Sequence, residues 1–112
     1  MKSEKNNLHI ANQENINLAI EKIISGDIIV YPTDTLYSFG ADATNSQALK
    51  KLNKIKKRKS PYSILISKIS DIIKFADVKQ SILIKLKLIL PGPFTILLLS
   101  KNNPKISKLV QQ

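Results

Sequence analysis

The sequence predicts an α/β domain in which helices pack on a β-sheet. Three observations lead there. Segments with a three-to-four-residue apolar period alternate along the chain with short β-branched runs. Apolar residues make up 43% of the 112 residues, enough for a core, and no repeat or low-complexity linker divides them. One domain over residues 1–112 follows from this length.

The first half predicts two strands and two helices. Residues 7–11 and 27–31 read as strands, and the second is closed by Pro32. Between them, residues 12–26 have a helical period, with Asn12 as the N-terminal cap and Gly26 just past the end. The apolar stripe of this helix is Ile16, Ala19, Ile20, Ile23 and Ile24. Residues 45–59 predict the next helix, capped by Asn45, with the stripe Ala48, Leu49, Leu52 and Ile55.

The second half continues the alternation. Residues 62–67 and 94–100 read as buried strands, and Ser70 is expected to cap a short helix. Residues 77–90 predict a helix that is apolar on more than one face and therefore largely buried. The Pro-Gly-Pro at 91–93 ends it. The tail, 101–112, is polar and predicts no closing element.

Composition excludes several chemistries. The chain has no cysteine and one histidine, His9, so disulfides, thiolate metal sites and Ser-His nucleophile pairs are not expected. No metal site of its own is predicted. The polar N-terminus has no signal-peptide pattern, and no apolar run reaches the roughly 18 residues of a membrane helix. A soluble, cytoplasmic protein without membrane contact is expected.

The basic excess has two open interpretations. The chain has eighteen Lys and Arg residues and eight Asp and Glu residues, which gives a formal net charge of +10. Such an excess favours polyanionic partners, including tRNA or double-stranded RNA, or it solubilises the surface. Seven of the ten residues from Lys50 to Lys59 are basic. The outer positions of the predicted helix, where RNA would bind, are Lys50, Lys51, Lys54 and Lys57.

Residues 28–42, "IIVYPTDTLYSFGAD", put two threonine hydroxyls and a carboxylate at the exit of an apolar strand. In α/β sheets ligands bind at such strand ends, so Thr33, Asp34 and Thr35 are candidate ligand contacts. The alternative is a simple turn with Asp34 as its cap. Lys56 and Arg58 fall where the basic helix ends, so they could swing toward these residues. The chain contains neither glycine-rich phosphate motif, so side chains would have to hold any nucleotide.

Four blocks in this order resemble the YrdC/Sua5 family of L-threonylcarbamoyladenylate synthases. They are "YPTDTLYSFGADATNSQAL", "KIKKR", "PYSILI" and "LPGPFTILL", and they span nearly the whole chain. The resemblance implies a twisted, mixed α/β sheet of the YrdC/RibB-like type. It also implies an ATP-dependent nucleotidyltransferase that joins L-threonine, bicarbonate and ATP into threonylcarbamoyl-AMP, with Mg²⁺ present and pyrophosphate released. A downstream threonylcarbamoyl transferase would pass the group to adenosine 37 of tRNA.

Residue roles follow from the same resemblance. Thr33, Thr35 and Tyr37 would contact the threonine substrate. Lys56 and Arg58 match the family's K-x-R and would be the catalytic cations on the ATP phosphates. Ser60 would also contact the nucleotide.

The chain departs from the family pattern in several places. Ser38 and Lys59 replace a usual glycine and proline, and Leu65 replaces a histidine of some members. With these replacements the chain resembles the YciO-like branch of the family. The family's R-x-P and S-x-N segments are absent, so we expect a C-terminally truncated domain that is inactive alone and needs a complementary chain or symmetry mate. The alternative is a basic tRNA- or double-stranded-RNA-binding module without catalysis.

Overall fold

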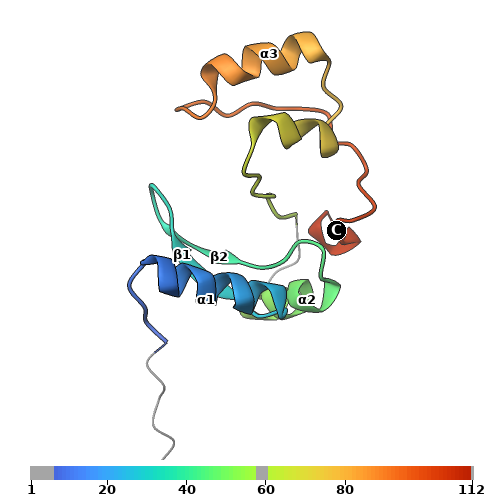
Figure 1. The fold of residues 1–112 in the computed structure, drawn as a ribbon. Coiled ribbons are helices and arrows are strands. Elements are labelled where there is room, and N and C mark those ends of the chain that lie inside the picture. Colours follow the sequence, from blue (N-terminus) through green and yellow to red (C-terminus); the bar gives the residue numbers. More distant parts are fainter. Residues whose placement is uncertain (1–6, 58–60, 112) are drawn as a thin grey trace, which may run out of the picture.

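The computed structural model describes residues 7–57 and 61–111, and Figure 1 shows them as two lobes. The lower lobe, here the α2 lobe, contains helices α1 (Gln13–Ile24) and α2 (Ser46–Lys56) and strands β1 (Ile29–Pro32) and β2 (Tyr37–Gly40). The upper lobe, here the α3 lobe, contains the 3-10 helix η1 (Ile69–Lys74) and helix α3 (Gln80–Ile89). A second 3-10 helix, η2 (Lys108–Val110), returns to the α2 lobe.

The caps of α1 form as predicted. The side chain of Asn12 accepts a hydrogen bond from the Asn15 amide at 2.9 Å. After the C-cap Ser25, Gly26 turns the chain with a φ of +89°, where a residue with a Cβ would be strained. No residue of α1 is buried, because the helix contacts the rest of the α2 lobe mainly through β1.

Strands β1 and β2 form an antiparallel hairpin, which confirms the α/β class. Ile29 pairs with Gly40, Val30 with Phe39 and Tyr31 with Ser38. The sequence predicts a strand at 27–31, which overlaps β1, and predicts no strand at 37–40, where β2 forms. A Cβ at Gly40 would lie 2.9 Å from the ring of Tyr31, so a larger residue there would displace this side chain.

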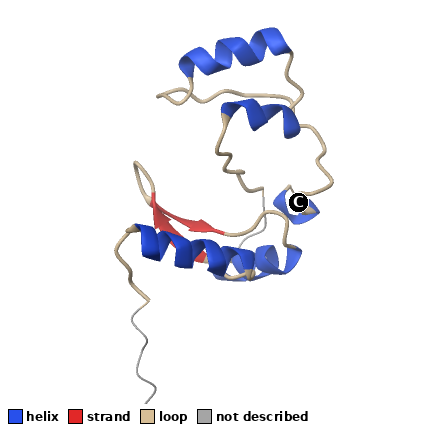
Figure 2. Cartoon of the chain, in the orientation of Figure 1, coloured by secondary structure: helices blue, strands red, loops and turns tan. Residues whose placement is uncertain are grey.

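The strands predicted at 7–11, 62–67 and 94–100 do not form in the described structure, which has one sheet of two strands. Figure 2 shows the last two stretches as loop. A strand needs a neighbour for its backbone ladder, and 94–100 makes only the isolated bridge between Ala76 and Ser100. A β-branched composition is therefore present without the pairing that would turn it into a sheet.

Helix α2 begins as predicted and ends early. Asn45 Oδ1 accepts from the amides of Gln47 at 3.0 Å and Ala48 at 3.2 Å. The helix stops at Lys56, not at residue 59, because Lys57 adopts the left-handed conformation with a φ of 52°. Leu49 and Leu52 are buried, but Ile55, assigned to the same stripe, is 50% exposed.

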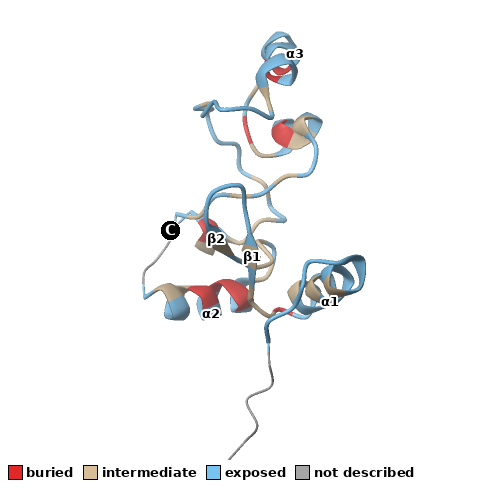
Figure 3. Cartoon of the chain, turned by 90° about the vertical axis from the view of Figure 1, so that its left-hand side faces the viewer, coloured by how far each residue is buried: buried red, intermediate tan, exposed pale blue. Residues whose placement is uncertain are grey.

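Both helices of the α3 lobe differ from their predictions. Helix η1 starts after Lys68, so Ser70 is not its cap, and no side chain caps it. Only Leu83 and Leu86 of α3 are buried, whereas Leu88 is 82% exposed. The prediction of a largely buried helix is wrong for this structure, because α3 packs on one side against η1 and is open on the other (Figure 3).

The tail does close the α2 lobe, contrary to the prediction of no closing element. Val110 is 2% exposed and packs with Leu49 and Leu52. The Tyr62 amide donates to the Val110 carbonyl at 2.9 Å, and the Ser107 amide to the Ala43 carbonyl at 2.8 Å. One valine and two backbone contacts thus fix a segment whose composition is polar.

The whole molecule is open. Its accessible surface is 9580 Å², against about 6,200 Å² for a folded monomer of this length. Its radius of gyration is 16.3 Å, against about 13 Å for a compact domain. In the segments described here, no helix is long and apolar enough to cross a membrane.

Candidate functional site

The main candidate site is a cavity of about 680 Å³ in the α2 lobe. Its walls are the β1–β2 hairpin, helix α2 and the segment 61–65, and Val110 from the tail also lines it. This volume falls within the range of about 300–1,000 Å³ of small-molecule sites. The polar side chains on its wall are Tyr31, Tyr37, Ser38, Lys56, Tyr62 and Ser63.

Lys56 is the cation of this cavity. It lies in the last turn of α2 and is half-buried. Its ammonium lies 5.6 Å from the centre of the Tyr62 ring, within cation–π range. The Tyr62 hydroxyl donates to Asn53 Oδ1 at 2.6 Å. Two residues of α2 thus hold the tyrosine, and its ring faces the lysine.

Tyr37 brings a second predicted residue to the same cavity. It is the first residue of β2 and is 75% exposed. Its neighbour Ser38 lies opposite Tyr31 across the hairpin, and both line the cavity. The structure therefore places Tyr37 from the hydroxyl-rich stretch and Lys56 from the basic run on one hollow.

Thr33 and Thr35 lie in the turn between the strands and do not line the cavity. The Thr33 hydroxyl donates to the Leu36 carbonyl and accepts from the Leu36 amide at 3.1 Å. The Thr35 amide also points to it, at 3.3 Å. These contacts give Thr33 a structural role in the turn, in line with the alternative interpretation of this stretch as a simple turn.

Arg58 and Ser60, predicted for the nucleotide, lie outside the described residues. Tyr62 and Ser63, which follow them in the sequence and line the cavity, are not among the predicted site residues. Their signal was weak, because both stand in a stretch that reads as a buried strand. Pro61, next to a run of cations, was the one local indication that the chain turns toward the basic helix end.

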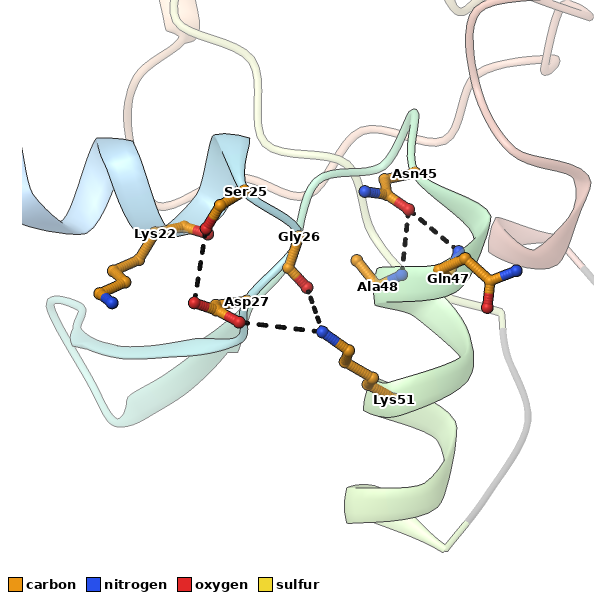
Figure 4. Close-up of polar contacts among 8 residues, drawn as sticks. All are labelled: Lys22, Ser25, Gly26, Asp27, Asn45, Gln47, Ala48 and Lys51. Atoms are coloured by element: carbon orange, nitrogen blue, oxygen red, sulfur yellow. Dashed lines mark hydrogen bonds and ion pairs between the residues drawn. The ribbon is translucent and has the colours of Figure 1, made fainter.

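The outer lysines of α2 differ among themselves. Lys51 donates to the Gly26 carbonyl at 3.1 Å and lies 3.8 Å from an Asp27 carboxylate oxygen, as Figure 4 shows. It therefore ties α2 to the end of α1. Lys50, Lys54 and Lys57 are exposed, and no ion pair is formed by them with the other described residues.

Metal-binding groups do not gather in the described part of the chain. No cluster of three or more His, Cys, Asp or Glu side chains occurs there. The carboxylate of Asp42 accepts from the Thr44 amide and hydroxyl, at 2.9 and 2.7 Å, and so organises the turn before α2.

The fold and the site thus define an α/β protein with a ligand-sized, tyrosine-lined cavity facing a cation. Residues 21–112 match the sequence model of the Sua5/YciO/YrdC family, whose description reads "Telomere recombination". The match covers most of the chain, and the chain belongs to this family.

Relatives with curated names support this family assignment. The chain is 38% identical over 95 residues to the "Putative threonylcarbamoyl-AMP synthase" of Methanocaldococcus jannaschii, which covers 80% of this chain and 44% of that protein. It is 29% identical over 87 residues to the threonylcarbamoyl-AMP synthase of Homo sapiens, covering 76% of this chain and 31% of the relative. The Aliivibrio fischeri synthase is 29% identical over 69 residues, 60% of this chain and 37% of that protein. The matched part is less than half the length of each relative.

Proposed function

We propose that this chain carries part of the active site of a threonylcarbamoyl-AMP synthase. The reaction joins L-threonine, bicarbonate and ATP into threonylcarbamoyl-AMP and releases pyrophosphate. Family membership supports the reaction class. The single observation that carries the assignment to these residues is that Tyr37 and Lys56 line the same cavity.

In this proposal the cations act on the phosphates. A threonine-derived carbamate attacks the α-phosphorus of ATP, and pyrophosphate leaves, so negative charge gathers on the phosphate oxygens. Lys56 and Arg58 are the catalytic cations that stabilise this charge, and Ser60 contacts the nucleotide. Mg²⁺ would arrive on the ATP phosphates, because the described residues contain no carboxylate cluster to hold it.

The threonine side of the site belongs to the hairpin. Tyr37 lies on the cavity wall. Thr35 lies in the turn just before β2, and its hydroxyl is 3.5 Å from that of Thr33. We assign Thr35 and Tyr37 to the threonine substrate. Thr33 contributes to the threonine site indirectly, because its hydroxyl holds the turn that precedes Tyr37.

The site is completed by a further polypeptide segment in this proposal. The relatives are more than twice as long as the matched part. The chain alone would bind substrates weakly and turn them over only with such a segment. A downstream transferase in the cytoplasm would then use the product on tRNA.

Calorimetric titration with ATP and threonine, together with a pyrophosphate-release assay, tests the proposal. We expect Lys56→Ala and Arg58→Ala each to weaken ATP binding by about tenfold or more, as loss of a charge-assisted contact does. Lys85→Ala on the exposed face of α3 is the matched control and should bind ATP as the parent does. ATP binding that survives both site changes would contradict the assignment.

A second candidate function, RNA binding, has its own observation. Lys50, Lys54 and Lys57 are exposed on α2, in a chain of net charge +10. Binding of tRNA or double-stranded RNA should weaken steeply as salt rises, because condensed counterions are released. The paired change Lys50→Gln with Lys54→Gln should reduce both affinity and salt slope. Lys51 is unsuitable for this test because it also ties α2 to α1.

A further inference from the structure

A second cavity lies where the tail crosses between the two lobes, far along the chain from the hairpin. Its volume is about 330 Å³, and segment 101–111 supplies most of its wall. Phe75 closes it from the α3 lobe and Ile64 from the α2 lobe. Neither the family match nor the proposed reaction assigns a role to these residues.

Hydrogen bonds at both ends fix the segment that forms this wall. Toward the α3 lobe, the Lys101 amide donates to the Phe75 carbonyl at 2.8 Å, and Asn103 Nδ2 to the Lys74 carbonyl at 3.1 Å. Toward the α2 lobe, the hydroxyls of Ser107 and Ser46 lie 2.7 Å apart. The segment that forms the cavity wall is therefore fixed by hydrogen bonds to both lobes.

The cavity wall is cationic and has no counter-charge. Lys101 and Lys108 supply two ammonium groups, and none of the residues that line the cavity carries a carboxylate. Lys101 Nζ donates to the Ile73 carbonyl at 3.3 Å, which leaves two of its three N–H groups. The Lys108 side chain forms no hydrogen bond or ion pair within the described segments. Both lysines are exposed, and a bound anion would balance their positive charges.

The neutral groups around the lysines also suit an anionic ligand. Asn102 and Gln111 supply amide donors at the wall, and Phe75 and Ile64 supply an apolar side. Ammonium groups with amide donors suit phosphate oxygens. The aromatic ring suits a planar, non-polar group attached to the phosphate.

We propose that this cavity binds a small phosphate monoester. Its phosphate contacts Lys101 and Lys108, and its non-polar part packs against Phe75. The cavity volume is at the lower end of the roughly 300–1,000 Å³ typical of ligand sites, so a compact ligand fits better than a whole nucleoside triphosphate.

Phenyl phosphate is the probe for the test, titrated into the full chain at constant ionic strength and followed by amide NMR shifts. We expect saturable shifts at residues 101–103, 107 and 108. Lys108→Gln should weaken binding by about tenfold, the size expected for one charge-assisted contact. This side chain makes no contact that the fold needs, so the variant should keep the parent spectrum elsewhere.

Two controls make the result decisive. Lys87→Gln removes one charge from exposed α3 and should leave the affinity unchanged. Inorganic phosphate should bind more weakly than phenyl phosphate, and Phe75→Leu should reduce that difference. Shifts that never saturate, or an equal loss in Lys87→Gln and Lys108→Gln, would mean general charge attraction and would overturn the proposal.

Discussion

Tyr62 shows how one side chain can shape the candidate site. Its hydroxyl donates to Asn53 and its ring faces the ammonium of Lys56. Asn53 and Lys56 are three residues apart on α2 and so lie on the same side of the helix. The tyrosine therefore joins the segment 61–65 to the helix end that carries the cavity's cation.

Removing the Tyr62 hydroxyl and removing its ring should have different effects. Tyr62→Phe leaves the half-buried Asn53 oxygen without this donor and should lower the free energy of unfolding by about 1 kcal/mol. Tyr62→Leu also removes the cation–π contact, so it should weaken ATP binding as well, by about two- to fivefold. Urea unfolding and ATP titration measure the two effects. Equal ATP affinity in the Phe and Leu variants would show that the ring does not position Lys56.

The hydroxyl of Thr33 should matter for the turn and not for direct contact with substrate. Thr33→Val removes the acceptor of the Leu36 and Thr35 amides and should destabilise the hairpin by about 1 kcal/mol. Thr33→Ser keeps the hydroxyl and should restore most of that stability. Amide exchange of residues 29–40 is the measurement. A stable Val variant that has lost threonine binding would return Thr33 to the substrate site.

At the scale of elements, the two capped helices differ in what they bury. Helix α2 buries Ala48, Leu49 and Leu52 and packs against Val110. Helix α1 buries none of its residues and contacts the rest through the hairpin. A cap of the same residue type therefore stabilises a core helix in one case and an outer helix in the other.

Replacing each cap by alanine should reveal this difference. Asn45→Ala loses two hydrogen bonds to amides of α2 and should lower the free energy of global unfolding by about 1 kcal/mol. Asn12→Ala should fray α1 and reduce helical signal, with less effect on the cooperative transition. Circular dichroism during urea unfolding, compared with amide exchange in α1, separates the two. A larger global effect from Asn12 would mean that α1 belongs to the core.

Helix α3 offers a comparison between its two sides. Leu83 is 3% exposed and Leu88 is 82% exposed on the same helix. Leu83→Ala should cost about 2–5 kcal/mol because it leaves a cavity against η1, whereas Leu88→Ala should change stability little. Thermal unfolding of the two variants measures this. If both lose the same stability, then the outer face of α3 is covered in solution.

At the scale of the whole molecule, apolar surface is the dominant feature. Large apolar side chains stay exposed on both lobes, including Val30 and Phe39 on the hairpin and Leu97 at 94% in the extended segment after the Pro-Gly-Pro. A hydrophobic surface of this extent favours association, while the net charge of +10 opposes contact between identical chains.

Salt should therefore promote self-association. As ionic strength rises, repulsion between the positively charged chains is screened and the apolar attraction remains. Sedimentation at low and high NaCl should show a weight-average mass that increases with salt, and a hydrophobic dye should bind at low salt. A monomer at every salt concentration with no dye binding would contradict this reading of the surface.

Features that act over a few residues were predictable from the sequence. The caps Asn12 and Asn45 and the turn at Gly26 are found where they were predicted. The buried part of the α2 stripe was also found, because helical period and helix face are linked by geometry. Tyr37, which the family resemblance names, lines one cavity with Lys56, whereas Thr33, Asp34 and Thr35, which the strand-exit argument names, do not line it.

The amino-acid sequence by itself determined the caps at Asn12 and Asn45, the turn at Gly26, the family and the basic character of the chain, because these depend on near neighbours and on residue type. Only the tertiary structure decided which β-branched segments pair, that Val110 of a polar tail fills the core of the α2 lobe, and that the Thr33 hydroxyl serves the turn. These outcomes depend on which distant or opposing group is in reach. A hydrogen bond or an apolar contact has its effect only when both partners are brought together.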